Sequence, residues 1–447
     1  AIVERENLGG VCLNWGCIPT KALLESAHFF EKVKFADKVG VKIEKATADF
    51  NAIIDRSRSV ANQMNKGVDY LMRKNNIEVI IGTAEFVDSN SISIRNNETV
   101  TQINARRFIV AVGARARSLP NLKIDENRII SYRQAMLLTE LPNRLCIVGA
   151  GAIGIEYADF YRSLGSEVTI IEAMPHILPI EDQEISAQLL KSFQDRGIVI
   201  HTDTKLNKAT STDANVEVEF TDRAGKTHLE SFDRLLLATG IIANTDQLKL
   251  EVVNVDLERD RIKVNQYFQT SNPMIYAIGD CILGPALAHV ASHEGIHAAE
   301  SIYLSLRESG VVQTGPIFDY EPMQYQWIPS CTYCHPEVAS AGLTEKKAKE
   351  QGFDVLIGKF PFRALGRARA SGEADGFVKI VVDKVYHRLL GIHIIGSQAT
   401  EMISEVVVAA EGELLADNLA RTIHAHPTLS EGIMEAAAEA IGQAIHI

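Results

Sequence analysis

The stretch Arg144-Leu-Cys-Ile-Val-Gly-Ala-Gly-Ala-Ile-Gly154 decides the fold of this chain. Its first five residues predict a short buried strand, and its last six have the glycine pattern GxGxxG of a nucleotide-binding turn. A helix over Ile155–Leu164 and a second strand over Glu167–Ile171, ending in Glu172, follow directly. Strand, glycine turn, helix, strand and acid in this order predict a complete βαβ dinucleotide-binding unit.

The glycines and the acid of this unit predict which ligand it binds. Gly149, Gly151 and Gly154 permit a tight turn and a close approach of the backbone to a pyrophosphate at the helix N-terminus. Glu172 is placed to bind a ribose hydroxyl pair and would repel a 2′-phosphate. Because residues 173–179 contain no arginine, NAD is favoured over NADP. The alternatives are a glycine turn without a ligand and an exposed acid at a strand end.

The composition excludes several classes of protein. The chain has 447 residues, 46% hydrophobic and 23% charged, which is typical of a soluble protein of two to four domains. No run of about 18 uncharged apolar residues occurs, so an integral membrane protein is not expected. The net charge is −12 and neither Lys nor Arg forms a run, which argues against nucleic acid as a partner.

A second nucleotide-binding unit begins the chain in an incomplete form. Ala1-Ile-Val-Glu4 predicts the end of a strand with its own terminal acid, where Glu172 lies in the other unit. A first strand, glycine turn and helix would need about 30 further residues, so we expect the sequence to be an incomplete record. The runs 107–113 and 234–240 resemble each other, since each is apolar and ends in glycine, which indicates two related nucleotide domains in tandem.

The pair Cys12 and Cys17, separated by Leu-Asn-Trp-Gly, is the sharpest local signal. Residues five apart in a regular helix rise about 7.5 Å, and a disulfide tolerates a Cα separation of about 4.4–6.8 Å, so a bridge requires a break in the helix. Pro19 fits the first turn of a helix predicted over Thr20–Val33, whose N-terminus favours the thiolate of Cys17. The alternative is two buried cysteines that never meet.

Four segments resemble the flavin disulfide reductases, a family of pyridine nucleotide-disulfide oxidoreductases. Gly9–Leu24 is similar to the active-site disulfide segment, and Thr270–Asp280 to the second flavin motif. Ile328–Ala339 resembles the interface-domain signature, and His424–Glu431 the segment that carries the catalytic base. The four motifs occur in the family's order and extend over nearly the whole chain, with the branch that oxidises dihydrolipoamide the most similar.

The resemblance implies roles for the residues around the disulfide. Cys12 would be the thiol that exchanges with the substrate, and Cys17 the thiolate beside the flavin ring. Lys21 is similar to the lysine near flavin N5, which pairs with the acid matching Glu156.

Other residues would bind the cofactors. The resemblance assigns Asp280 to the ribitol of FAD and Glu4 to its adenine ribose, and it places Gly113 and Gly240 among the cofactor-binding residues.

His426 and Glu431 would complete the chemistry. A dithiol with a thiol pKa near about 8.5 is mostly protonated at neutral pH, so a base must accept a proton, and histidine suits this role. Glu431 would orient the ring. The alternative for His426-Pro427 is a structural turn. In the family this base comes from the neighbouring subunit, which implies a homodimer with shared active sites.

The remaining cysteines are predicted to pack in the core. Cys331 and Cys334 have CxxC spacing, but no second Cys or His pair stands at the spacing of a zinc site, so we predict no metal. Cys146 and Cys281 are also expected in the core, the latter near the flavin because it follows Asp280.

Together these observations predict an α/β fold with two Rossmann-like nucleotide-binding domains, a central domain and a C-terminal α+β dimerisation domain. We expect a truncated FAD-binding domain with the redox disulfide at 1–117, an NAD-binding domain at 118–243, a central domain completing the FAD site at 244–314, and the interface domain at 315–447.

The expected reaction is oxidation of protein-bound dihydrolipoamide, with electrons passing through Cys12–Cys17 and FAD to NAD. The lack of arginines in the NAD loop argues against glutathione reductase, and the end 443–447, without a cysteine pair, argues against mercuric reductase. The partners implied are lipoyl-bearing proteins of 2-oxoacid dehydrogenase or glycine cleavage complexes, in a bacterial cytoplasm or, alternatively, the mitochondrial matrix. A truncated, flavin-free structural dimer is the rival hypothesis.

Overall fold

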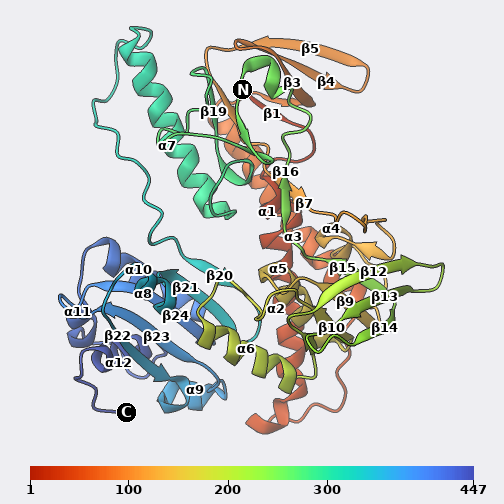
Figure 1. Ribbon diagram of the computed structural model, residues 1–447, viewed down its shortest axis with the longest axis vertical. Helices are drawn as coiled ribbons and strands as arrows, with labels where there is room; N and C mark the ends of the chain where they lie inside the picture. The colour runs from red at the N-terminus through yellow and green to blue at the C-terminus, as the bar shows by residue number, and fades with distance from the viewer. Residues whose placement is uncertain (447) are drawn as a thin grey trace. The chain divides into compact units, whose positions relative to one another are not determined.

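The computed structural model describes residues 1–446, and these form two compact units, each assembled from three stretches of the chain (Figure 1). The first unit contains residues 1–19, 55–117 and 240–324, and the second contains residues 20–54, 118–239 and 325–446. Each unit is described by itself below.

A parallel five-stranded sheet in the second unit contains the predicted βαβ unit. The strand order is β11-β10-β9-β15-β8. Strands β9 and β10 begin and end where the sequence predicts, because their apolar residues are buried. The helix α5 (Ala152–Leu164) begins three residues earlier than predicted, since Gly151 is its N-cap. The strands are β8 (Ile129–Ile130), β9 (Arg144–Val148), β10 (Glu167–Ile171), β11 (Val199–His201) and β15 (Arg234–Leu237).

The order of this sheet places the glycine turn at a topological switch point. Both β10 and β15 pair in parallel with β9, so the chain leaves β9 in one direction and later returns on its other side. Ligands of open α/β sheets bind at this position, beyond the carboxyl ends of the strands. The short helix α4 (Tyr132–Ala135) and the helix α6 (Gln183–Asp195) belong to this part of the chain, as does an antiparallel layer of β12 (Lys205–Ser211), β13 (Val216–Thr221) and β14 (Thr227–Phe232).

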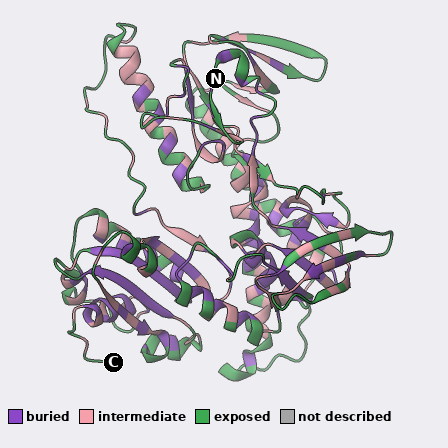
Figure 2. Cartoon of the chain, in the orientation of Figure 1, coloured by how far each residue is buried: buried purple, intermediate pink, exposed green. Residues whose placement is uncertain are grey.

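An antiparallel sheet forms the C-terminal part of the second unit. Its order is β20-β21-β24-β23-β22, and its central strands β23 and β24 are buried along their whole length (Figure 2). A Cβ on Gly358 would lie 1.8 Å from the carbonyl oxygen of Ala436, so a glycine is required where the helix α12 packs on β22. The strands are β20 (Ser330–Thr332), β21 (Glu337–Gly342), β22 (Val355–Pro361), β23 (Phe377–Asp383) and β24 (Leu389–Gly396).

Helices cover this sheet and complete its core. The helices α10 and α12 contribute buried apolar residues, among them Ile403 and Ile433, to the same core as Ile392 of β24. The helices are α8 (Glu345–Glu350), α9 (Gly366–Ser371), α10 (Ala399–Glu411), α11 (Ala416–Arg421) and α12 (Glu431–Ala440).

The first unit contains short parallel pairs and an antiparallel meander. β1 (Ile2–Glu4) pairs with β2 (Val79–Ile81), and β19 (Ile275–Ala277) pairs with β6 (Phe108–Val110). These pairs form two separate sheets, in contrast to the continuous sheet around β9. The other strands are β3 (Thr83–Asp88), β4 (Ser91–Asn96), β5 (Thr99–Asn104), β7 (Ala114–Ala116), β16 (Ile241–Ala243), β17 (Leu257–Glu258) and β18 (Arg261–Ile262).

The helices of the N-terminal segment agree with the sequence pattern except at their first turns. The helix predicted over Thr20–Val33 is α2 (Cys17–Lys34), and α1 (Gly10–Trp15) precedes it. The helix α3 (Phe50–Lys74) begins after Asp49, because the Asp49 carboxylate accepts a hydrogen bond from the N–H of Ala52 and so caps the helix there. The long helix α7 (Ala288–Glu308) follows β19 in the chain.

No helix within residues 1–446 is both long and apolar enough to cross a membrane.

Candidate redox and nucleotide-binding sites

Cys12 and Cys17 form a disulfide at a break between two helices. Cys12 lies in α1, Cys17 begins α2, and their Cα atoms are 4.6 Å apart. A Cβ on the intervening Gly16 would lie 3.1 Å from the carbonyl oxygen of Val11 and 3.2 Å from Cα of Cys12, so a side chain there would crowd the turn. The prediction that the helix must break is confirmed, and the alternative of two cysteines that never meet is wrong.

Hydrogen bonds from α3 hold the backbone around the disulfide. Arg58 Nη1 donates to the carbonyl oxygen of Asn14 at 2.7 Å, and Asn65 Nδ2 donates to that of Leu8 at 2.6 Å. The Arg58 guanidinium also lies 4.4 Å from the ring centroid of Trp15. Side chains of α3 therefore bind the chain on both sides of Cys12.

Lys21 and Glu156 form a partly buried ion pair. Lys21 Nζ lies 2.8 Å and 2.9 Å from the two carboxylate oxygens of Glu156, which is 6% exposed. The structure thus brings together the two residues that the resemblance pairs. Tyr333, which the sequence analysis did not single out, donates its N–H to Glu156 Oε1 at 3.0 Å, and its ring centroid lies 4.4 Å from Lys21 Nζ.

Two of the three glycines after β9 are required by the backbone around them, and the third is not. Gly149 has a φ of 104°, and a Cβ there would lie 2.4 Å from the carbonyl oxygen of Ala238. A Cβ on Gly154 would lie 2.0 Å from the carbonyl oxygen of Gly149, so helix packing excludes a side chain. Gly151 has φ −75° and ψ 179°, which any residue adopts, and nothing lies within 4 Å of the position that a Cβ would take. Since the protein itself does not require that glycine, the open space at the N-terminus of α5 fits a diphosphate.

Glu172 joins the glycine turn to the end of β10. Its carboxylate accepts hydrogen bonds from the N–H groups of Ala150, at 2.6 Å, and Met174, at 2.8 Å. The residue is buried, so the alternative of an exposed strand-end acid is wrong. A carboxylate has about four lone-pair sites, and two remain for ribose hydroxyls.

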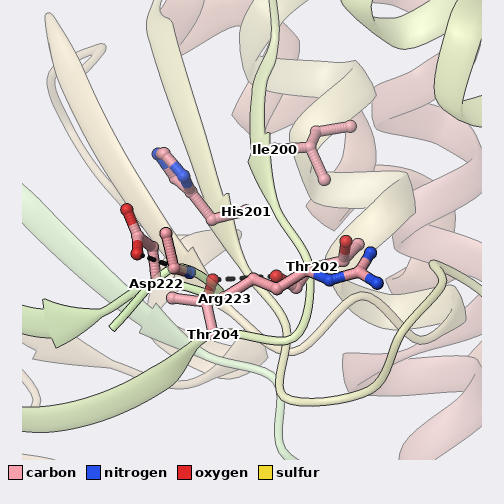
Figure 3. Close-up of a pocket in the computed structure, with 7 residues that line it drawn as sticks. Ile200, His201, Thr202, Thr204, Asp222 and Arg223 are labelled. Carbon is pink, nitrogen blue, oxygen red and sulfur yellow. Dashed lines mark hydrogen bonds between the residues drawn. The ribbon is translucent and has the colours of Figure 1, made fainter. Parts of the chain in front are cut away.

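A cavity of about 320 Å³ lies next to this strand end (Figure 3). The N–H of Thr204 donates to the carbonyl oxygen of Glu172 at 2.9 Å, which fixes one wall of the cavity to the end of β10. Arg223 also lines it, and its guanidinium lies 3.6 Å from the Asp203 carboxylate. Arg223 was not predicted, because it lies outside residues 173–179, where an arginine for a 2′-phosphate would be expected. The lining residues are Ile200, His201, Thr202, Thr204, Asp222, Arg223 and Ala224.

Gly113 and Gly240 lie at opposite ends of one short ladder in the first unit. Both have positive φ, 63° and 101°, and both have open space at the side-chain position. The strands that follow them, β7 and β16, pair with each other. The N–H of Asn244 donates to the carbonyl oxygen of Gly113 at 3.0 Å, and that of Arg117 to Gly240 at 3.1 Å. The strands that follow the two similar segments 107–113 and 234–240 thus pair with each other.

Asp280 and Glu4 offer carboxylates in the same unit. Burial raises the pKa of Asp280, although nearby Arg261 opposes the shift. Arg261 Nη1 donates to the main-chain oxygen of Asp280 at 2.7 Å, and among the described residues none hydrogen-bonds to its carboxylate. A half-buried acid without a protein partner fits a residue that binds a ligand hydroxyl, as the FAD ribitol requires. Glu4 accepts a hydrogen bond from the N–H of Glu6 at 2.8 Å.

His426 and Glu431 form the expected pair at the start of α12. His426 Nδ1 lies 2.8 Å from Glu431 Oε1, and the N–H of Thr428 donates to Glu431 Oε2 at 2.8 Å. Burial alone would raise the pKa of Glu431, but these hydrogen bonds and the nearby histidine charge lower it. The histidine ring is 77% exposed, so its Nε2 edge faces solvent in this chain. His426 belongs to the second compact unit and the disulfide to the first.

The other four cysteines are not bonded to one another. Cys146, Cys281 and Cys334 are buried, and Cys331 is partly buried against the core of the C-terminal sheet. Burial raises the pKa of Cys281 to about 11 and that of Cys331 to about 12. Within residues 1–446, no group of three or more His, Cys, Asp or Glu side chains is arranged to hold a metal ion.

Comparison with known families agrees with this geometry. A model described as pyridine nucleotide-disulphide oxidoreductase matches residues 1–295, and the model of its dimerisation domain matches residues 328–437. The chain belongs to the pyridine nucleotide-disulphide oxidoreductase family. The dimerisation-domain match of this oxidoreductase includes both Tyr333 and His426.

Named relatives are similar to this oxidoreductase over nearly its whole length. The dihydrolipoyl dehydrogenase of Zymomonas mobilis is 42% identical over 447 residues, which cover 100% of this chain and 93% of that protein. A Bacillus subtilis dihydrolipoyl dehydrogenase is 39% identical over 448 residues, covering 100% and 92%. Among solved structures, LpdA from Mycobacterium tuberculosis has a TM-score of 0.86 at 27% identity, covering 98% of this chain and 92% of that one. The HOCl-induced flavoprotein disulfide reductase RclA from Escherichia coli has a TM-score of 0.83 at 26% identity, covering 98% and 93%.

Proposed function

We propose that this oxidoreductase is a dihydrolipoyl dehydrogenase, which oxidises protein-bound dihydrolipoamide to lipoamide with NAD as the electron acceptor. The observation that carries the proposal is the Cys12–Cys17 disulfide, with its Cα atoms 4.6 Å apart at the start of the helix that also carries Lys21. The named relatives with 37–42% identity over the whole chain are dihydrolipoyl dehydrogenases.

FAD and NAD are its cofactors, and residues in both units fit them. The residues assigned to FAD are Asp280, Glu4, Gly113 and Gly240. The assignment is supported by the Asp280 carboxylate, which has no hydrogen-bond partner among the described residues, and by the open space at the two glycines. Gly149, Gly151, Gly154 and Glu172 are assigned to NAD, on the support of the space beside Gly151. When bound, FAD supplies a two-electron relay between a dithiol and a nicotinamide.

The two cysteines take different roles. Cys12 exchanges with the substrate, forming a mixed disulfide with one substrate sulfur while Cys17 leaves as thiolate. Cys17 is the first residue of α2, where the positive end of the helix dipole stabilises a negative sulfur. Lys21, held by Glu156, lies one helical turn further along α2 and adds a fixed positive charge to this end of the helix.

His426 accepts the proton that the substrate thiol loses. Glu431 receives Nδ1–H, which leaves Nε2 as the basic atom and stabilises the imidazolium that forms. The exposed ring fits a base that serves a site built partly by a second subunit. The match to a dimerisation domain supports a homodimer, and we propose that its active sites are shared between the subunits.

The proposed partners are lipoyl-bearing proteins of 2-oxoacid dehydrogenase or glycine cleavage complexes. We also propose the division into FAD-binding (1–117), NAD-binding (118–243), central (244–314) and interface (315–447) domains. The bacterial relatives support a bacterial cytoplasm as the location. The mitochondrial relative from Schizosaccharomyces pombe, 37% identical over 451 residues, makes the mitochondrial matrix the alternative.

Another disulfide substrate is the second candidate, which the structural similarity to RclA favours. Steady-state assays of the purified holoenzyme separate the two. We expect NAD reduction with dihydrolipoamide, and little NADPH oxidation with glutathione disulfide. The variant Cys12→Ser is the control and should abolish the dihydrolipoamide reaction. Absence of that reaction in the wild-type enzyme, with its flavin bound, would assign the protein to another substrate.

A further inference from the structure

Lys21 is contacted from two elements, α5 and the segment that follows β20. Its ammonium lies between both carboxylate oxygens of Glu156, on α5, and the ring of Tyr333, which directly follows β20. The same Tyr333 donates its N–H to Glu156, so one residue binds the acid through its backbone and contacts the lysine through its ring. A cation over an aromatic face is attracted by the ring quadrupole, and more strongly where water is partly excluded.

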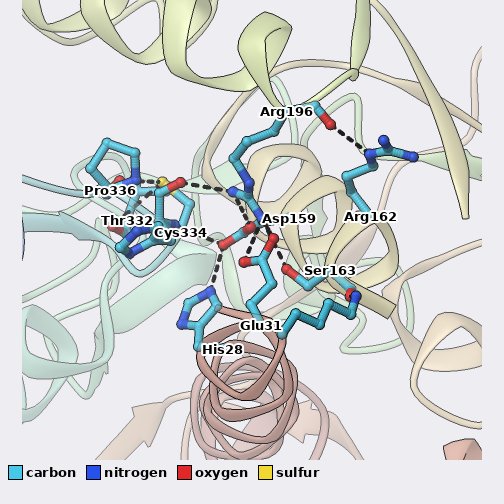
Figure 4. Close-up of polar contacts among 11 residues, drawn as sticks. His28, Glu31, Asp159, Arg162, Ser163, Arg196, Thr332, Cys334 and Pro336 are labelled. Atoms are coloured by element: carbon cyan, nitrogen blue, oxygen red, sulfur yellow. Dashed lines mark hydrogen bonds and ion pairs between the residues drawn. The ribbon is translucent and has the colours of Figure 1, made fainter. Parts of the chain in front are cut away.

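A second group of contacts lies one helical turn further along α5, around the fully buried Asp159 (Figure 4). Asp159 Oδ2 lies 2.7 Å from His28 Nε2, and it accepts a hydrogen bond from the N–H of His335 at 2.7 Å. Asp159 Oδ1 lies 2.5 Å from Arg196 Nη1. Burial alone would raise the pKa of Asp159, but Arg196 and His28 hold it down at about 2, so the carboxylate is ionised.

Arg196 extends this cluster in three further directions. Its Nη1 donates to the carbonyl oxygen of His335 at 2.8 Å, and its Nη2 lies 3.0 Å from Glu31 Oε2 and 2.9 Å from Ser163 Oγ. His335 is thus bound at both its N–H and its carbonyl group. Because the two members of a buried ion pair bind His335 on both sides of its Cα, the segment has little freedom to move away from α5.

The two groups of contacts repeat one arrangement along α5. Glu156 and Asp159 are three residues apart on one helix face. Each carboxylate accepts a hydrogen bond from a backbone N–H in the segment 333–335, and each pairs with a side chain of α2. Lys21 is the α2 partner of Glu156, and His28 is that of Asp159. The cluster around Asp159 therefore fixes the backbone of the segment that presents the Tyr333 ring to Lys21.

We propose that Tyr333 is a positioning residue for Lys21: its ring keeps the lysine ammonium on Glu156, and the ion pairs of Asp159 hold Tyr333 in place. The proposal rests on the role proposed above for Lys21 beside the flavin. The position of the Lys21 ammonium then depends on the segment 333–335 as well as on α5. Tyr333→Phe keeps the aromatic face, whereas Tyr333→Leu replaces it with a smaller aliphatic side chain.

The test measures the reactivity of Lys21 itself. The holoenzyme is labelled briefly with acetic anhydride, and acetylation of Lys21 is compared by mass spectrometry with that of Lys249, which pairs with Glu85 in the first unit. Loss of the ring contact in Tyr333→Leu should raise the relative rate about three- to tenfold, and Tyr333→Phe should stay within about twofold of the wild type. Equal rates in Tyr333→Leu and the wild type would overturn the proposal.

A second variant and a double-variant cycle distinguish positioning of Lys21 from a purely structural role of Tyr333. Asp159→Asn leaves the Tyr333 ring in the chain but removes the charge that holds its segment, and it should raise Lys21 labelling in the same direction. In a Lys21→Met background, Tyr333→Leu should change turnover by less than about twofold, because it acts through the lysine. An equal loss of turnover in both backgrounds would show a structural role and overturn the proposal. The labelling result is independent of substrate, so it stands even where wild-type enzyme fails to oxidise dihydrolipoamide.

Discussion

The Nζ atom of Lys21 lies 2.8 Å from Oε1 of Glu156, although 135 residues separate the two in the chain. The pair joins α2, which begins at Cys17, to α5, which begins at the glycine turn. The carboxylate is almost fully buried, and its only charged partner among the described contacts is this lysine. The pair therefore connects the helix that begins at Cys17 with the helix that follows the glycine turn.

Removing Lys21 should destabilise the protein. Lys21→Met leaves the buried Glu156 without its cation, and we expect a loss of about 1–3 kcal/mol in the free energy of unfolding. Lys32→Met on the same helix is the matched control, since Lys32 is 68% exposed where it pairs with Glu373. It should cost less than about 1 kcal/mol. Urea unfolding of both variants measures the difference, and equal losses would contradict the account.

The glycines of the nucleotide turn should separate stability from binding. Gly154→Ala places a Cβ against the carbonyl oxygen of Gly149 and should cost about 1–3 kcal/mol of stability or more. Gly151→Ala meets open space at an ordinary φ and should keep or slightly raise stability. It should nonetheless weaken NAD binding by about tenfold, equivalent to about 1.4 kcal/mol. Thermal unfolding and NADH titration test this, and unchanged affinity in Gly151→Ala would argue against the pyrophosphate lying there.

His426 should matter for the substrate half of the reaction alone. His426→Gln removes the base and should lower turnover with dihydrolipoamide by about 10²- to 10⁴-fold. Reduction of ferricyanide by NADH, which needs no thiol base, should remain. His446→Gln is the matched control, because His446 makes a similar exposed pair with Glu435 at 2.7 Å. Equal effects of the two substitutions would contradict the assignment of the base.

Asp159 should contribute to acid stability. Its pKa is about 2 in the folded protein and 3.8 ordinarily, so its contribution is fully present above about pH 4 and is lost as the pH falls toward 2. The shift corresponds to about 2 kcal/mol. Asp159→Asn should remove this part of the pH dependence, whereas substitution of the exposed Asp195 to Asn should not. Unfolding free energies between pH 2 and pH 7 measure the slope, and the same slope in wild type and Asp159→Asn would contradict the ion-pair account.

The elements around the nucleotide turn are predictable from sequence because local patterns specify them. The strands 144–148 and 167–171 are rich in buried apolar residues, and both have the predicted bounds. The helix α5 starts three residues before its predicted first residue, since a glycine N-cap gives no side-chain signal. The disulfide was predictable because the helix break it needs is present in the sequence as Gly16.

The contacts of Asp159 were not predicted, because its partners are far apart in the chain. His28 is 131 residues away, and the N–H of His335 is 176 residues away. A helical signal was nevertheless present: Asp159 follows Glu156 by three residues, and His28 follows Lys21 by seven, so each pair lies on one helix face. Tyr333 gave no such signal, since its backbone and ring contacts depend on how the segment after β20 docks on α5.

The most direct test of the central claim is the visible spectrum of the purified holoenzyme before and after anaerobic addition of dihydrolipoamide. We expect a flavin spectrum that gains a long-wavelength band, because we propose that reduction of Cys12–Cys17 leaves the Cys17 thiolate beside the flavin. A flavin that stays fully oxidised with dihydrolipoamide, yet is reduced by NADH, would contradict the claim that this disulfide serves lipoamide.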